Sequence, residues 1–123
     1  MKYRITANEG MVPNQLYGVT DDGQHFYFRG RLGRWQLHFG ATEDEAITGP
    51  GYEGENDTAG WFELDEWEAF FWEVVKTVED GTATPLDLER HKKDMDEFLI
   101  RAIETAVPLT LLNWNQEIKG EQK

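Results

Sequence analysis

The chain has 123 residues, no cysteine, 39% hydrophobic residues and a formal net charge of −12. This length and composition are typical of a single globular domain, over residues 1–123, that buries a sizeable core without cross-links. The absence of cysteine excludes disulfides, a thiol nucleophile and cysteine-ligated zinc. No segment has the run of about 18 apolar residues that a membrane span needs, and the amino terminus lacks the apolar stretch of a signal peptide. We therefore expect a cytoplasmic protein that does not associate with membranes.

Acidic residues are concentrated in the middle third of the chain. Residues 41–80 hold thirteen Asp or Glu and one basic residue, Lys76, whereas residues 1–40 hold five Lys or Arg against three acids. Such a charge distribution repels nucleic acid and attracts basic proteins. We therefore expect a basic protein partner and no direct binding of nucleic acid.

Alternating apolar and polar residues predict antiparallel strands in the first forty residues. The segments at about 15–20, 25–30 and 34–40 alternate with a period of two, and the turn sequences DDGQ and GRLG separate them. KYRITA also alternates and predicts a further strand at about 2–7. Together these segments predict a meander sheet of three to four strands.

The two turns also predict which residues face each other. A two-residue turn at Asp22-Gly23 places Tyr17 opposite Phe28, and the second turn places Phe28 opposite Trp35. One face of the sheet then carries the apolar side chains of Phe26, Phe28, Trp35, Leu37 and Phe39.

The opposite face combines basic and aromatic side chains, namely His25, Tyr27, Arg29, Arg34, Gln36 and His38. In the predicted register Arg29 lies opposite Arg34, and His25 lies opposite His38. Like charges in directly opposed positions destabilise a sheet, so acidic side chains are expected to offset them. Gly18 would lie opposite Tyr27 and leave part of that ring uncovered.

An irregular acidic loop is predicted over about 43–60, because the sequence TGPGYEGENDTAG at 48–60 is rich in Gly, Pro and Asn. One helical turn is compatible with the start of this loop, since Thr42 and Glu45 have the spacing of a capping box.

Two helices are predicted after the loop, at about 65–80 and 85–106. The first carries an apolar stripe with a period of 3.6 residues: Trp67, Phe70, Phe71, Val74, Val75 and Val78. Gly81 can end the first helix, and Pro85 suits the first position of the second. Packing of both helices on one face of the sheet gives a two-layer α+β fold. Residues 109–114 are too short a segment to assign, and 115–123 are expected to fray.

The acidic segment predicts a surface for binding another protein. Trp72 falls off the apolar stripe, and an exposed tryptophan among carboxylates is typical of an interface anchor. The candidate partner-binding residues are Glu66, Glu68, Trp72, Glu73 and Asp80. The expected function is non-enzymatic binding of a basic protein, and its most specific form is a nucleic-acid-mimicking inhibitor of the kind that phages and other mobile elements direct against defence complexes. A surface that is merely solvated remains an open alternative.

The basic and aromatic face carries a second hypothesis, the binding of a small anionic ligand such as a nucleotide. Arg29 and Arg34 would hold the anion and Tyr27 would stack on a ring, with His25, Gln36 and His38 completing the candidate site. In the plainer alternative, carboxylates of the acidic loop fold over these arginines.

A third hypothesis is a small enzyme that uses His25 or His38, although the sequence contains no recognised catalytic motif. Two histidines without a third placed ligand are a weak signal for a metal, so no cofactor is expected.

Overall fold

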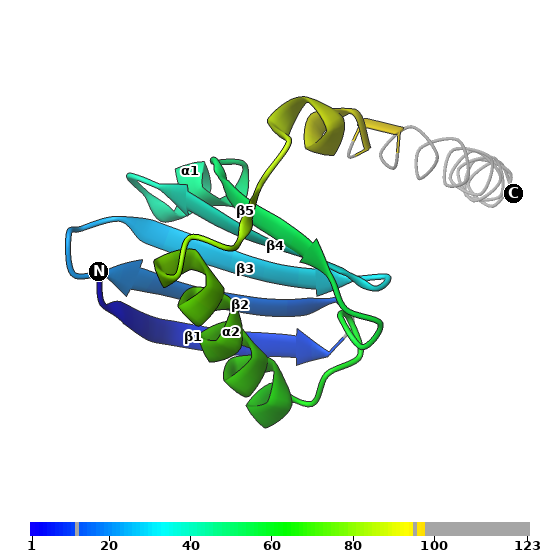
Figure 1. Ribbon diagram of the computed structural model, residues 1–123, viewed down its shortest axis with the longest axis horizontal. Helices are drawn as coiled ribbons and strands as arrows, with labels where there is room; N and C mark the ends of the chain where they lie inside the picture. Colours follow the sequence, from blue (N-terminus) through cyan, green and yellow to red (C-terminus); the bar gives the residue numbers. More distant parts are fainter. Residues whose placement is uncertain (12, 95, 98–123) are drawn as a thin grey trace, which may run out of the picture. The chain divides into compact units, whose positions relative to one another are not determined.

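The computed structural model of the chain describes residues 1–11, 13–94 and 96–97. Six strands form one antiparallel sheet in the order in which they follow one another along the chain, and a long helix crosses one face of it (Figure 1). The chain divides into two compact units, 1–86 and 87–123. The elements of the first unit are β1 (Tyr3–Met11), β2 (Asn14–Thr20), β3 (His25–Arg31), β4 (Arg34–Gly40), α1 (Glu43–Ile47), β5 (Gly51–Glu55), α2 (Leu64–Glu79) and β6 (Thr84–Pro85).

The predicted α+β class with an antiparallel sheet is confirmed, but the predicted number of strands is wrong because the sheet has six. β5 lies inside the segment predicted as a loop because of its glycines. The strand needs those glycines: a Cβ on Gly51 would lie 1.7 Å from the carbonyl oxygen of Leu37, and a Cβ on Gly54 would lie 2.5 Å from the Trp35 ring. The glycines that predicted a loop are therefore needed because β5 packs closely against β4.

Residues 43–47 also depart from the predicted irregular loop, because they form the short helix α1. Thr42 is the N-cap of α1, since its hydroxyl accepts a hydrogen bond from the Glu45 N–H at 3.1 Å. α1 lies on the face of the sheet opposite α2: a Cβ on Gly40 would meet the backbone nitrogen of Ala46 at 2.4 Å, and Ala46 is fully buried.

The second predicted helix begins later than expected. Pro85 belongs to β6 and lies opposite Tyr52 of β5, a position that suits a residue without an N–H because β6 is an edge strand. Helical residues begin at Leu88, and the Asp87 carboxylate caps them by accepting a hydrogen bond from the Arg90 N–H at 3.1 Å.

The first hairpin has a three-residue turn at 21–23 instead of a two-residue turn. Gly23 adopts φ 87°, the left-handed conformation that commonly ends such a turn. The extra residue shifts the pairing by one position, so Tyr17 lies opposite Tyr27 and not Phe28. Leu16 consequently points to the face covered by α2 and is fully buried.

The second hairpin has a two-residue turn in which Leu32 and Gly33 both have positive φ, 52° and 78°. Phe28 lies opposite Leu37, so the predicted pairing with Trp35 is wrong by two residues. A shift of two positions leaves each side chain on the same face. The predicted grouping of apolar residues on β3 and β4 is therefore confirmed.

Leu32 should be a weak point of this turn. Its side chain is 75% exposed, and the left-handed conformation costs a residue with a Cβ about 1 kcal/mol, whereas Asn adopts it readily. We expect Leu32→Asn to raise the free energy of unfolding by about 0.5–1 kcal/mol in urea denaturation. Leu32→Val should lower it, because β-branched residues tolerate positive φ least. A loss of stability with Asn would show that Leu32 makes a contact worth more than the strain.

α2 covers the face of the sheet that carries the apolar side chains. Trp67 and Phe71 are fully buried, and the Trp67 ring stacks on that of Phe28 with 4.2 Å between centroids. Gly81 follows the helix with φ 76°, as predicted for its end. The buried core consists of Leu16, Phe26, Phe28, Trp35, Leu37, Ala59, Phe62, Trp67, Phe71, Val74 and Val75.

One buried side chain fixes the loop between β5 and α2 to the sheet. The Asn14 amide donates a hydrogen bond to the Phe62 carbonyl at 2.9 Å, and its oxygen accepts from the N–H groups of Gly60 and Phe62, both at 3.0 Å. Since Asn14 begins β2, these hydrogen bonds connect the sheet directly to the residues that precede α2.

Three predictions concern residues outside the described part of the chain: the helix end at 106, the unassigned segment 109–114 and the frayed terminus 115–123. Within the described part, no helix has both the length and the apolar character needed to cross a membrane.

Candidate binding surfaces

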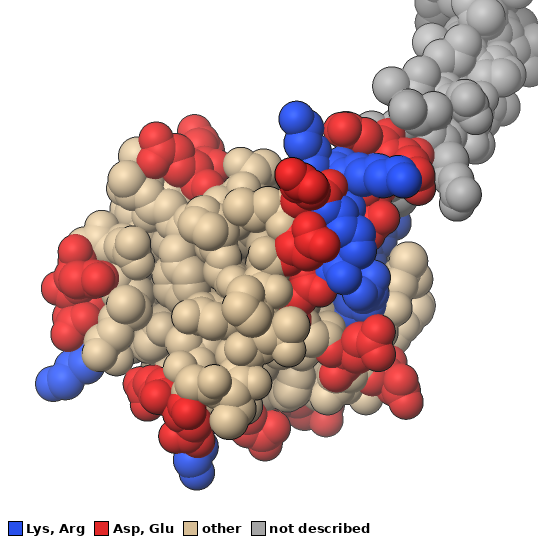
Figure 2. Space-filling model, turned by 45° about the horizontal axis from the view of Figure 1, so that its top comes forward, with Lys and Arg blue, Asp and Glu red and all other residues tan. Residues whose placement is uncertain are grey.

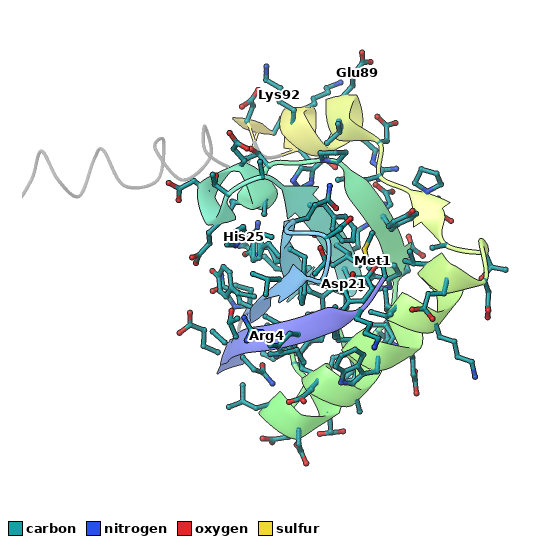
Figure 3. The ribbon with its side chains drawn as sticks, turned by 90° about the vertical axis from the view of Figure 1, so that its left-hand side faces the viewer. Met1, Arg4, Asp21, His25, Glu89 and Lys92 are labelled. Carbon is teal, nitrogen blue, oxygen red and sulfur yellow. The ribbon has the colours of Figure 1, made fainter. Side chains whose placement is uncertain are left out.

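The predicted ligand residues lie on the face of the sheet that α2 does not cover, here called the α1-side face. Three rings form a row across β2, β3 and β4 on this face. Tyr17 and Tyr27 stack with 5.0 Å between centroids, and Tyr27 and His38 stack with 6.0 Å. In the next row, Arg29 lies directly opposite Gln36. His25 occupies the end of β3, on the side of the sheet away from α2 (Figure 3).

Two residues of the predicted ligand site are buried. Tyr27 is 6% exposed and His38 is 1% exposed, and the His38 Nδ1 lies 2.8 Å from the Gly49 carbonyl oxygen. The segment from α1 to Gly49 covers this part of the face, since Ala46 packs against Gly40 of the same strand as His38. Tyr27 is consequently not available as a stacking platform for a ligand.

Burial also alters the acidity of the tyrosines. It raises the pKa of Tyr27, while the nearby charge of Arg29 and a hydrogen bond from Gln15 act in the opposite direction. Burial likewise raises the pKa of Tyr17, and the carboxylates of Glu9 and Glu43 add to this effect. Both phenols remain neutral at physiological pH.

The predicted opposition of like charges is corrected by the register. Arg29 does not face Arg34 and His25 does not face His38; the opposed basic pair is Arg31 and Arg34, next to the turn. β5 supplies acids in this region, with Glu55 opposite Arg34 and Glu53 opposite Gln36. The expectation that carboxylates of the 43–60 segment offset the arginines thus has a structural basis. Arg31 was overlooked because the sequence assigned it to the turn.

The predicted partner-binding residues lie on the outward face of α2, defined here as the exposed residues of the helix and its C-cap: Leu64, Asp65, Glu66, Glu68, Ala69, Trp72, Glu73, Lys76, Thr77, Glu79 and Asp80. Intervals of seven place Glu66, Glu73 and Asp80 along one flank of this face. Glu68 and Trp72, four residues apart, occupy the other flank. The five predicted residues therefore form two stripes of one surface.

Trp72 is 43% exposed, and its ring makes an edge contact with the buried Phe71 ring, with 5.0 Å between centroids and 61° between planes. The contact fixes one side of the indole against the core and leaves the other side to solvent. On the side of the molecule drawn in Figure 2, Asp and Glu gather in several separate groups around a broad area of other residues.

Three exposed apolar side chains, two of them near the β3–β4 turn and one at the start of α2, were not singled out from the sequence. Leu32, Trp61 and Leu64 are 75%, 59% and 43% exposed. Gly60 brings two of them together, because its Cα lies so close to β3 that a Cβ would be 3.1 Å from the Leu32 nitrogen. The sequence signal for this exposed apolar group is Trp61, which lies between Gly60 and the acidic residues at the start of α2.

Among the described residues, no group of three or more His, Asp or Glu side chains is arranged to hold a metal ion. Comparison with protein-family models, with curated proteins and with solved structures finds no match to this chain.

Proposed function

We propose that this chain is a non-enzymatic binding protein that engages a basic protein partner through the outward face of α2. The observation that carries the proposal is Trp72, a tryptophan 43% exposed between Glu68 and Glu73. From Glu63 to Val75 the sequence contains five acidic residues and no Lys or Arg. Trp72 is thus an apolar anchor on a face that carries six carboxylates and one ammonium group, that of Lys76, and a predominantly acidic surface of this kind selects an oppositely charged partner.

The charge of the surface favours a partner that otherwise binds nucleic acid. Exposed carboxylates repeated along a helix present a row of negative charges, as the phosphates of a nucleic acid do, and a basic groove attracts both. The most specific form of the proposal is therefore a nucleic-acid-mimicking inhibitor. Trp72 would supply the protein-specific contact that a phosphate backbone lacks.

The test is the release of basic proteins from DNA-cellulose by the purified protein, at low salt and at about 0.15 M salt. We expect the triple variant E66Q/E68Q/E73Q to bind the released proteins about tenfold more weakly, and therefore to release less of them at the same concentration. The reason is that an exposed ion pair contributes about 0.5 kcal/mol and three are removed. Trp72→Ala should have an effect of at least similar size, since a central tryptophan is a common hot spot.

The matched control is E43Q/D44N/E45Q on α1, which removes the same number of charges from another exposed helix. It should release basic proteins as the wild type does. Equal losses for both triple variants would mean that only bulk charge matters, and full release by the α2 variant would overturn the proposal. Release of no protein at either salt would overturn the nucleic-acid-mimicking form.

A second candidate function is the binding of a small anionic ligand on the α1-side face. The observation in its favour is the convergence of Arg29, Arg31 and Arg34 on adjacent positions of β3 and β4. The burial of Tyr27 and the acidic residues of β5 weaken it. Thermal stabilisation by nucleotides that is lost in Arg29→Ala would favour this candidate over the first.

A further inference from the structure

A groove of about 390 Å³ lies on the α2 side of the sheet, between the ends of β1, β4 and β5 and the last turn of α2. Its walls are almost entirely apolar: Tyr3, Phe39, Pro50, Tyr52, Val78 and Pro85. A groove of this size accommodates one large side chain or a small molecule. None of the residues of the acidic surface described above forms its walls.

Three aromatic rings surround this groove at steep angles to one another. The centroids of Tyr3 and Phe39 are 6.2 Å apart with 57° between planes, and those of Phe39 and Tyr52 are 6.4 Å apart with 89°. Tyr3 is held in place by edge contacts with the buried rings of Phe26 and Phe71. The rings are therefore fixed before any ligand arrives.

The charges near the groove favour a positively charged occupant. Burial raises the pKa of Tyr3 to about 12, with further contributions from Tyr52 and from the carboxylates of Glu79 and Asp22. The phenol is thus neutral, and two carboxylates act on it from nearby. No Lys or Arg lines the groove, and Met1, which carries the amino terminus, and Gln24 complete its walls.

The amino terminus and Lys2, which directly precede β1, carry two positive charges near the carboxylate of Asp21. A hydrogen bond of 3.0 Å from the Lys2 backbone N–H to the Asp21 carboxylate lowers the pKa of Asp21, and the charges of the Met1 amino group and the Lys2 side chain lower it further. Met1 and Asp21 lie together at this end of the sheet (Figure 3). The Asp21 carboxylate offsets one of these two positive charges, and Glu79 and Asp22 are the carboxylates that act on Tyr3 at the groove.

We propose that this aromatic groove binds an arginine side chain of the basic partner. The inference rests on the proposed function and extends it. A guanidinium is planar, weakly hydrated and attracted to the faces of aromatic rings, more so than the compact ammonium of lysine. The groove also adjoins the α2 surface, because a second hollow of about 420 Å³ shares Met1 and Tyr3 with the groove and is otherwise lined by Lys2, Trp72, Val75, Lys76 and Glu79. A protein seated on Trp72 can therefore extend an arginine into the groove.

The test uses a probe that contains no partner protein: N-acetyl-arginine methylamide, compared with the citrulline analogue, its neutral isostere. Aromatic ¹H–¹³C NMR spectra follow the rings of Tyr3, Phe39 and Tyr52 during titration. We expect the arginine probe to bind about fivefold more tightly than the citrulline probe, the size of a cation–π contact. Tyr52→Ala should abolish the difference and Tyr52→Phe should retain it.

Two further variants keep the result interpretable if Tyr52→Ala perturbs the fold. Glu79→Gln, on the exposed surface of α2, should weaken binding of the arginine probe about twofold. Tyr17→Ala, which removes a tyrosine from the other face of the sheet, should leave the titration unchanged.

Each other outcome overturns the inference. Equal binding of both probes would show a groove that recognises apolar surface only, and the absence of ring shifts would show that it binds neither. Binding unaffected by Tyr52→Ala would place the probe elsewhere. The two proposals can fail separately. The arginine probe can bind even if the protein releases nothing from DNA-cellulose. Conversely, the α2 variants can release less basic protein than the wild type even if the probe does not bind.

Discussion

Asn14→Ala is expected to lower the free energy of unfolding by about 3 kcal/mol, because it leaves buried backbone groups without partners. The Asn14 side chain is fully buried and makes three hydrogen bonds to Gly60 and Phe62, of which two satisfy N–H groups and one satisfies a carbonyl. A methyl group in its place makes none of these hydrogen bonds, so the N–H groups of Gly60 and Phe62 and the Phe62 carbonyl lose them in a buried environment.

The measurement is guanidinium denaturation together with hydrogen exchange at the amides of Gly60 and Phe62, which should exchange faster by a factor that matches the loss of local stability. Asn8→Ala is the matched control, since Asn8 makes one exposed hydrogen bond to the Leu64 carbonyl in the same region. It should cost less than about 1 kcal/mol. A loss below 1 kcal/mol for Asn14→Ala would show that water replaces the amide at little cost.

Gly18→Ala is expected to lower the free energy of unfolding by about 2–3 kcal/mol through overpacking. Gly18 lies directly opposite Phe26, and its Cβ would lie 2.2 Å from the tip of the Phe26 ring and 2.2 Å from the carbonyl oxygen of Arg4. The ring cannot move away easily, because it stacks on Phe71 with 5.1 Å between centroids.

A double-mutant cycle with Phe26→Leu separates the two clashes. In the Phe26→Leu background, Gly18→Ala should cost about 1 kcal/mol less, since the shorter side chain removes the contact with the ring but not the contact with Arg4. Additive losses in chemical denaturation would mean that the backbone of β1, and not Phe26, carries the whole strain.

Side-chain periodicity predicted the parts of this fold that depend on which face a residue occupies. The apolar stripe from Trp67 to Val78 identified α2, and alternation identified β1 to β4, because burial of one face imposes these periods directly. Turn length is not encoded in that way. Asp22-Gly23 is compatible with a two-residue or a three-residue turn, and the choice shifted β2 by one position.

The candidate sites were predictable to different degrees for the same reason. An off-stripe position was enough to place Trp72 at the surface of α2. The burial of His38 was not predictable, because the cover comes from α1, a helix of five residues whose position depends on close packing at Gly40. The aromatic groove was also beyond prediction, since its rings come from β1, β4 and β5 and meet only through the sheet.

The order of the strands has a consequence for how the chain folds. Because β1 to β4 pair consecutively through short turns, this part of the sheet forms by closing short loops only, which favours fast folding, whereas β5 and β6 are separated by residues 56–83. β1 to β4 lie within the first forty residues, so these hairpins can form while the acidic segment is still being synthesised. The contact of Asn14 with Phe62 spans 48 residues and forms afterwards. The negative charges of α2 are thus added to the chain after β1 to β4 have been synthesised, so the pairing of these four strands does not depend on them.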